Sequence, residues 1–178
     1  AKEHAQPVSL RVGRAPAQVG FNRRLVNEKT GHVFMGVNRA GLVVPWVNVL
    51  VADSKETGKP IAVLFEHAAH PVIVPAISKL TSADYPGAAV KRIREELGEG
   101  VIALFGQGCG GNINGYPLRS THENADRQGR KLGDAVLSIG MDPELQKWRM
   151  EQIAEGAEKA GRDPAEIDVW IRTQCYIT

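Results

Sequence analysis

Three short segments of the chain combine residue types that bind metals, move protons or contact ligands through the backbone. They are FEHAAHP (residues 65–71), TSADYPG (81–87) and FGQGCGGNINGY (105–116). The first holds two histidines, and an imidazole suits both metal ligation and general-base catalysis. The second holds a carboxyl group and a phenol, and the third holds closely spaced glycines. Each segment also has a purely structural explanation, which must be weighed against the chemical one.

His67 and His70 come directly after an apolar run, Ile61 to Glu66, that is typical of a strand. Pro71 restricts the backbone beside His70. The end of a strand can hold an imidazole in a fixed direction, as a metal ligand or a general base requires. An HxxH spacing alone is weak evidence, because two ordinary loop histidines explain it without any site.

The second segment has the composition of a helix start. Ser82, Asp84 and Pro86 are residue types that favour the first turn of a helix, so a structural cap accounts for them. In the functional alternative, the carboxyl of Asp84 or the phenol of Tyr85 reaches a site beside His70. Both explanations stay open on the sequence alone.

The third segment is a glycine-rich loop around Cys109, with Gly108, Gly110 and Gly111 beside it. Glycines permit close backbone approach and expose N–H groups, as a cradle for an oxyanion or a phosphate requires. The loop lacks the lysine and the Ser/Thr of a P-loop. Nothing in the sequence activates the Cys109 thiol as a nucleophile. A tight turn around a small buried cysteine is the structural alternative.

The surrounding pattern predicts an α/β fold, with a mixed sheet and flanking helices. Strands are expected over 47–52, 61–66 and 101–105, and helices over 82–97 and 121–139. The turn at 53–59 predicts that the first two strands form a hairpin. The runs 61–66 and 101–105 are almost continuously apolar, so we expect both strands to be buried. Ligands in such sheets usually lie beyond the carboxyl ends of the strands.

Composition excludes several classes of function. The chain has 178 residues, 43% of them hydrophobic, which suits one domain with a real core. Lys and Arg number 22 against 20 Asp and Glu, and this net charge of +2 gives no electrostatic reason for a nucleic-acid or acidic-membrane partner. No apolar run approaches the ~20 residues of a membrane span. Two cysteines form no disulfide framework, and no secretory signal is recognised, which leaves the compartment open.

The sequence changes character near Gly140, where Gly and then Asp142-Pro143 favour the end of one helix and the start of another. We therefore expect a main unit at 1–140 and an appendage at 141–178. The appendage predicts a helix over 143–160 and a strand over 166–173. One helix and one strand cannot bury enough surface alone, so they need a partner.

Taken together, the three segments resemble part of the catalytic domain of the neutral/alkaline (non-lysosomal) ceramidase family. The resemblance covers about residues 7–140 and includes VGFNRR (19–24) and NADRQGRKLGDAVL (124–137) in the same order and spacing. It implies a zinc-dependent amidohydrolase that cleaves the N-acyl amide bond of a ceramide-like lipid. It also implies that His70, in the HP dipeptide, is a zinc ligand, whereas no metal role transfers to His67.

Asn114, together with Asp84 and Tyr85 from the second segment, is a catalytic candidate. The resemblance further implies that the glycine loop, with Gly108, Gly110, Gly111 and Asn112, lines the pocket near the developing oxyanion. Zinc would polarise the amide carbonyl and lower the pKa of its bound water. Asn114 stands where characterised members carry a functional serine, and an amide cannot accept an acyl group. The family's other ligands are a histidine in an upstream HxHSGP-type segment and a downstream Glu and Tyr. Residues 1–16 contain no such segment, which predicts an incomplete domain.

Two alternatives belong to other classes of protein. The first is a non-catalytic α/β scaffold that keeps the fold without a complete metal site. The second is a flavin-dependent oxidoreductase, because 141–178, with AGRDPAEIDVW, resembles a segment of luciferase-like flavin or F420 monooxygenases. Those enzymes are TIM barrels, which one helix and one strand cannot close. The expected partners are a small-molecule or lipid amide substrate and, because an incomplete sheet exposes edges and apolar faces, a second copy of the chain.

Overall fold

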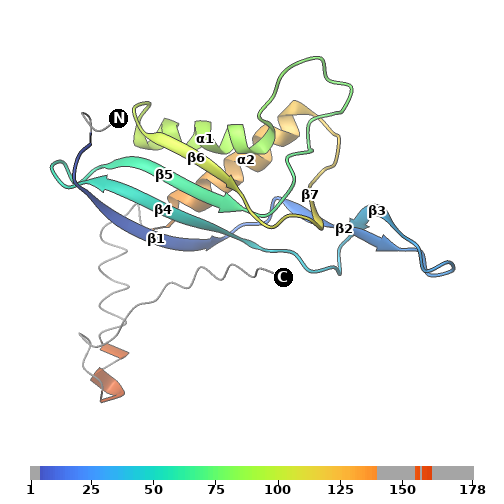
Figure 1. The fold of residues 1–178 in the computed structure, drawn as a ribbon, viewed down its shortest axis with the longest axis horizontal. Coiled ribbons are helices and arrows are strands. Elements are labelled where there is room, and N and C mark those ends of the chain that lie inside the picture. Colours follow the sequence, from blue (N-terminus) through green and yellow to red (C-terminus); the bar gives the residue numbers. More distant parts are fainter. Residues whose placement is uncertain (1–4, 140–154, 157, 162–178) are drawn as a thin grey trace.

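The computed structural model describes residues 5–139, 155–156 and 158–161. In chain order its elements are β1 (Val8–Pro16), β2 (Gly20–Val26), β3 (Val33–Asn38), β4 (Trp46–Ser54), β5 (Pro60–His67), α1 (Asp84–Leu97), β6 (Ile102–Gln107), β7 (Ile113–Gly115) and α2 (His122–Leu137). Figure 1 shows both helices on one side of the larger sheet, with the β2–β3 hairpin extending away from them.

The larger sheet has four strands in the order β1-β4-β5-β6. β4 pairs antiparallel with β1 and with β5, whereas β5 and β6 are parallel. The parallel pair requires a crossover, which α1 supplies. The predicted α/β fold with a mixed sheet is confirmed, as is the predicted hairpin, formed by β4 and β5.

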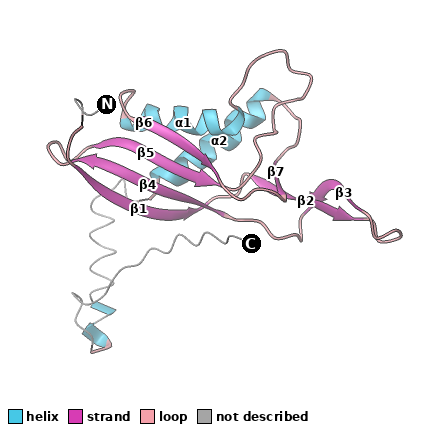
Figure 2. Ribbon diagram, in the orientation of Figure 1, coloured by secondary structure: helices cyan, strands magenta, loops and turns pink. Residues whose placement is uncertain are grey.

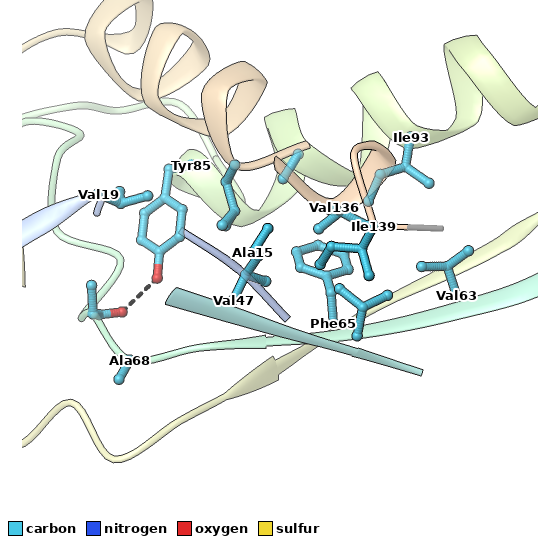
Figure 3. Packing of buried hydrophobic residues seen from close by; sticks show 14 of the residues in the cluster. Ala15, Val19, Val47, Val63, Phe65, Ala68, Tyr85, Ile93, Val136 and Ile139 are labelled. Atoms are coloured by element: carbon cyan, nitrogen blue, oxygen red, sulfur yellow. Dashed lines mark hydrogen bonds between the residues drawn. The ribbon is translucent and has the colours of Figure 1, made fainter. Parts of the chain in front are cut away.

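The core lies between this sheet and the two helices (Figure 3). Alternate residues of β4 and β5 point toward the helices, as the two-residue period of a strand dictates. They meet apolar side chains of α1 and α2. The central buried residues are Val47, Val49, Val51, Val63, Phe65, Ile93, Leu132 and Val136.

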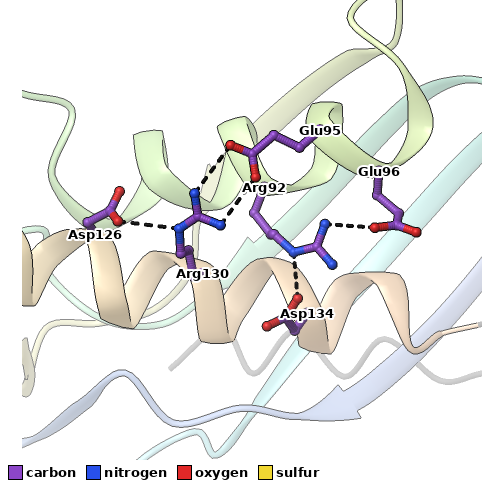
Figure 4. A network of polar contacts seen from close by, with 6 residues as sticks. All are labelled: Arg92, Glu95, Glu96, Asp126, Arg130 and Asp134. Atoms are coloured by element: carbon purple, nitrogen blue, oxygen red, sulfur yellow. Dashed lines mark hydrogen bonds and ion pairs between the residues drawn. The ribbon is translucent and has the colours of Figure 1, made fainter.

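α1 and α2 pack closely because small residues lie between them. A Cβ added at Gly129 would lie 2.3 Å from the carbonyl oxygen of Tyr85 and 2.4 Å from the Cβ of Ala88. Ion pairs cross the outer side of the contact, from Arg92 to Asp134 at 2.7 Å and from Arg130 to Glu95 at 3.2 Å (Figure 4). The contact between the two helices is therefore apolar on its inner side and charged on its solvent-facing side.

Both predicted helices are confirmed, with local signals that explain their ends. The backbone N–H of Gly98 bonds to the carbonyl of Arg94 at the end of α1. The Thr121 hydroxyl accepts from the backbone N–H of Asn124 at 3.1 Å and so caps the start of α2.

The strand over 61–66 was expected to be buried on both faces and the strand over 101–105 to be buried, but each is exposed on one face. Leu64, Ile102 and Leu104 are 42%, 58% and 53% exposed. The helices cover only one face of the four-stranded sheet (Figure 1), which leaves its other face open. The exposure of these side chains places them on the open face. A continuous apolar run therefore predicts a strand here, but it does not show whether helices cover one face of that strand or both.

A second, three-stranded sheet, in the order β3-β2-β7, was not anticipated from the sequence. β7 is a three-residue strand at the end of the glycine loop, and it pairs antiparallel with β2 through Gly20↔Gly115, Phe21↔Asn114 and Asn22↔Ile113. This pairing places the first residues of β2 beside the end of the glycine loop. It is the main long-range contact that shapes the candidate site.

The predicted boundary at Gly140 and the predicted strand at 166–173 lie outside the described residues, as does most of the segment 141–178 that resembles luciferase-like enzymes. Within the predicted helix at 143–160, the described residues Glu155, Gly156, Glu158 and Lys159 are helical. No helix in the described ranges has the length and hydropathy of a membrane-spanning segment.

Candidate functional site

The candidate site lies where β5 and β6 end. The two strands are parallel, with His67 opposite Gln107 in the register, so the HAAHP segment and the glycine loop leave the sheet at the same edge. This is the location predicted for ligands in an α/β fold. The sequence therefore placed the two segments correctly with respect to the sheet.

His67 points into the protein. Its side chain is 1% exposed, and its Nδ1 lies 2.9 Å from the carbonyl oxygen of Trp46. Its ring also contacts Tyr85 edge-on, with 6.4 Å between ring centroids. Burial lowers the pKa of His67, which favours the neutral imidazole. His67 is thus a core residue.

His70 is held at the protein surface by backbone bonds to the glycine loop. Its backbone N–H donates to the carbonyl of Ile113 at 3.0 Å, and its own carbonyl accepts from the N–H of Gly115 at 3.0 Å. Its Nδ1 lies 3.0 Å from the same carbonyl oxygen of Ile113. Because a carbonyl only accepts, Nδ1 carries a proton, and in the neutral ring the lone pair is therefore on Nε2. This orientation is the one that metal-ligating histidines adopt.

Asn114 lies next to His70 through an isolated parallel bridge. It is 7% exposed, and its Oδ1 accepts from Nη1 of Arg23 at 3.4 Å. A guanidinium has no acceptor, so Oδ1 faces Arg23 and the Nδ2 of Asn114 is left as a donor. The structure therefore brings His70 and Asn114 together, as predicted.

Arg23 joins this pair and was missed in the sequence, where Arg23-Arg24 reads as a surface charge pair. The backbone N–H of Arg23 donates to the carbonyl of Asn112 at 2.7 Å, and its Nε donates to the carbonyl of Gly111 at 3.1 Å. These contacts span about ninety residues of sequence, so no local pattern reports them. The only signal was the VGFNRR segment of the family resemblance.

The glycine loop is a series of tight turns. The N–H of Gly108 donates to the carbonyl of His67 at 3.1 Å, and the N–H of Gly110 donates to the carbonyl of Gly108 at 2.7 Å. Both amides are thus engaged within the protein. A Cβ added at Gly108 would lie 1.6 Å from Oε1 of Glu66, which explains that glycine by close packing. Cys109 is exposed, not buried as the structural alternative supposed.

Gly111 and Asn112 complete the loop. Nothing lies within 4 Å of a Cβ built on Gly111, and its carbonyl accepts from Arg23. The Nδ2 of Asn112 donates to the carbonyl of Leu42 at 3.1 Å. A role in lining a substrate pocket stays a prediction for all four loop residues.

Asp84 and Tyr85 brace the segment that carries His70. One carboxylate oxygen of Asp84 accepts from the N–H of Val74 at 2.7 Å, and the other accepts from the N–H of Tyr85 at 2.7 Å. The Tyr85 hydroxyl donates to the carbonyl of Ala69 at 2.6 Å. The tyrosine ring is fully buried among core residues (Figure 3), and burial raises its pKa. Their predicted direct catalytic roles stay predictions.

A hollow of about 530 Å³ lies between the starts of α1 and α2. Its polar lining includes Ser82, Lys91, His122 and Asp126. Of the residues predicted from the sequence, only Asp84 lines it. The hollow is therefore distinct from the cluster of His70, Asn114 and Arg23.

In the described part of the chain, no group of three or more His, Cys, Asp or Glu side chains lies close enough to hold a metal ion. The chemistry of His70 fits a zinc ligand, since an imidazole with its other nitrogen fixed is a common one. A catalytic zinc normally takes three protein ligands, so the described residues supply part of such a site and do not complete it.

Neither a family model nor a curated protein matches the chain. The solved structures that share its fold include a ceramidase complexed with C2 and neutral ceramidase from Pseudomonas aeruginosa. Each has a TM-score of 0.61 at 17% identity and covers 79% of this chain. The chain spans 23% and 24% of their respective lengths. It therefore has a ceramidase-like fold over part of the length of those enzymes.

Proposed function

We propose that this chain carries part of the active site of a ceramidase-like amidohydrolase, which cleaves the N-acyl bond of a lipid amide. The observation that carries the proposal is the position of His70. Its Nδ1 is fixed by a backbone carbonyl and its Nε2 is left with a lone pair, beside Asn114 and Arg23. The ceramidase-like fold supports the choice of reaction.

Zinc is the metal that suits this proposal, with His70 as one of its ligands through Nε2. A bound zinc would polarise the amide carbonyl and lower the pKa of a water molecule. The remaining ligands would come from residues outside the described ranges, because those ranges contain no further cluster of suitable side chains.

Asn114 and Arg23 would bind the polar part of the substrate. The Nδ2 of Asn114 can donate to a carbonyl oxygen, and Arg23 adds a positive charge beside it. Asn114 has no hydroxyl or thiol to accept an acyl group. The acyl acceptor would therefore be water, which adds to the carbonyl carbon as the C–N bond breaks, and the leaving amine takes up the proton.

Asp84 and Tyr85 would act as positioning residues. Their bonds to Val74 and Ala69 fix the chain on both sides of His70. The Tyr85 hydroxyl is protonated and donates at neutral pH, and burial raises its pKa further. In this view the two residues hold the imidazole in place without touching the substrate.

A second candidate function is a scaffold without catalysis. The partial ligand set and the amide side chain of Asn114 in the glycine loop favour it. The two candidates differ in one measurable property, because only the enzyme needs zinc at His70.

The test is the zinc content of the purified protein, together with hydrolysis of a fluorescent short-chain ceramide. His70→Ala is compared with His122→Ala, a matched change of an exposed histidine at the start of α2. The hydrolase proposal predicts near-stoichiometric zinc that only His70→Ala removes, with ceramide cleavage lost in parallel. Zinc-free protein under every loading condition, with no cleavage, counts against the hydrolase proposal and favours the scaffold.

A further inference from the structure

The β2–β3 hairpin is an arm with apolar side chains exposed on both of its faces. Val26 and Val33 face each other in the register and are 54% and 60% exposed, and Met35 on the same face is 55% exposed. On the opposite face Phe34 lies across from Leu25 and is 49% exposed. Figure 2 shows the arm projecting beyond the four-stranded sheet and away from both helices.

The same arm is positively charged. Residues 20–38 contain three basic side chains, Arg23, Arg24 and Lys29, and one acidic side chain, Glu28, which gives +2. The net charge of the whole chain is also +2, so the overall count does not show that this excess is concentrated in one hairpin. Arg24 and Lys29 are exposed beside the apolar residues.

We propose that the β2–β3 arm docks the protein on an anionic lipid bilayer. Apolar side chains combined with exposed basic residues are the combination that binds the interface of a negatively charged membrane. A flat protein partner would cover one face of the hairpin, whereas a lipid surface can surround both. The choice of a bilayer as the partner of the arm rests on the proposed function in one respect, because a lipid amide substrate resides in a bilayer.

The position of the arm connects docking to the candidate site. β2 is continuous from Arg23, which contacts the glycine loop, to Val26 on the arm. Three residues of strand separate them, roughly 10 Å at about 3.3 Å per residue. An arm seated at the bilayer surface therefore brings the cluster of Arg23, Asn114 and His70 close to the lipid headgroups.

Vesicle co-sedimentation tests the proposal without any catalytic readout. The probes are phosphatidylcholine vesicles with and without phosphatidylserine. The test variant is Phe34→Thr/Met35→Thr, in which threonine preserves the preference for a strand. Ile102→Thr/Leu104→Thr is the matched control, because those residues are 58% and 53% exposed on the sheet face.

We expect the unmodified chain to prefer vesicles that contain phosphatidylserine, and added salt to weaken this binding. The arm variant should bind roughly tenfold more weakly, since two apolar contacts are lost, while the control variant binds normally. An equal loss in both variants, or no binding to anionic vesicles, overturns the proposal. Self-association that the arm variant abolishes would instead make the arm an interface between copies. A chain without amidase activity that still binds vesicles leaves docking intact.

Discussion

The backbone N–H and the imidazole Nδ1 of His70 share one acceptor, the carbonyl oxygen of Ile113, at 3.0 Å each. This carbonyl belongs to the strand that follows the glycine loop. The ring of His70 is thus oriented by a loop more than forty residues away in sequence, and not only by the strand before it. A substitution that moves the carbonyl of Ile113 should therefore change the direction in which Nε2 of His70 points.

The first prediction concerns the tautomer of His70. Because Ile113 can only accept, we expect the neutral ring to carry its proton on Nδ1, with Nε2 unprotonated. Long-range nitrogen–proton NMR correlation of the imidazoles at about pH 7.5 distinguishes the two tautomers. The exposed His32 is the internal control and should show a mixture. A proton on Nε2 of His70 would contradict the orientation described above.

The second prediction concerns Tyr85→Phe. The change removes the bond to the carbonyl of Ala69 and leaves that buried acceptor without a partner. We expect the free energy of unfolding to fall by about 1–2 kcal/mol. Urea denaturation followed by circular dichroism measures this fall. Tyr116→Phe, at a partly exposed tyrosine, should cost clearly less, and equal costs would show that the Ala69 bond is unimportant.

The third prediction separates Arg23 from its neighbour Arg24. Only Arg23 contacts Gly111 and Asn114, so Arg23→Gln should lower kcat/KM for amide hydrolysis by about a hundredfold, the effect of losing one donor to a developing oxyanion. Arg24→Gln should leave it nearly unchanged. A monomeric, water-soluble substrate is used so that binding to lipid does not enter the measurement. If the two changes lower kcat/KM equally, Arg23 has no specific role in the candidate site.

The parts of this fold that sequence reasoning recovers are those with local signals. The apolar run before His67 and the apolar spacing within residues 82–97 and 121–139 each predict an element that the structure contains. The structure also brings His70 and Asn114 together, and their segments follow the neighbouring strands β5 and β6 of one sheet.

The parts that it missed depend on contacts between distant segments. β1 has alternating residues, but Leu10 and Val12 lie on the exposed face while Arg11 is on the helix side and pairs with Asp53. Its pattern is therefore inverted from that of an ordinary half-buried strand. Arg23 was missed for a related reason, because its role is defined by a loop about ninety residues away.

The fourth prediction concerns Gly129. A Cβ at this position would overlap the backbone of α1, so Gly129→Ala must push the two helices apart. We expect a loss of about 1–3 kcal/mol in the free energy of unfolding, as for overpacked cores. Gly100→Ala is the control, because nothing lies within 4 Å of its added Cβ. Urea denaturation measures the free energy of unfolding of both variants. No loss of stability in Gly129→Ala would contradict the close contact between α1 and α2.

The last prediction follows from the burial of His67, which lowers its pKa below the ordinary value of 6.5. In the unfolded chain this histidine takes up a proton near pH 6.5, whereas in the folded protein it does so only at lower pH. Its contribution to stability is therefore complete above about pH 6.5 and is lost as the pH falls toward the folded pKa.

His67→Asn keeps a donor for the carbonyl of Trp46 but does not titrate. We expect urea denaturation at about pH 7.5 and about pH 5 to show a smaller loss of stability in this variant than in the unmodified chain. Identical losses would mean that His67 is not the group responsible.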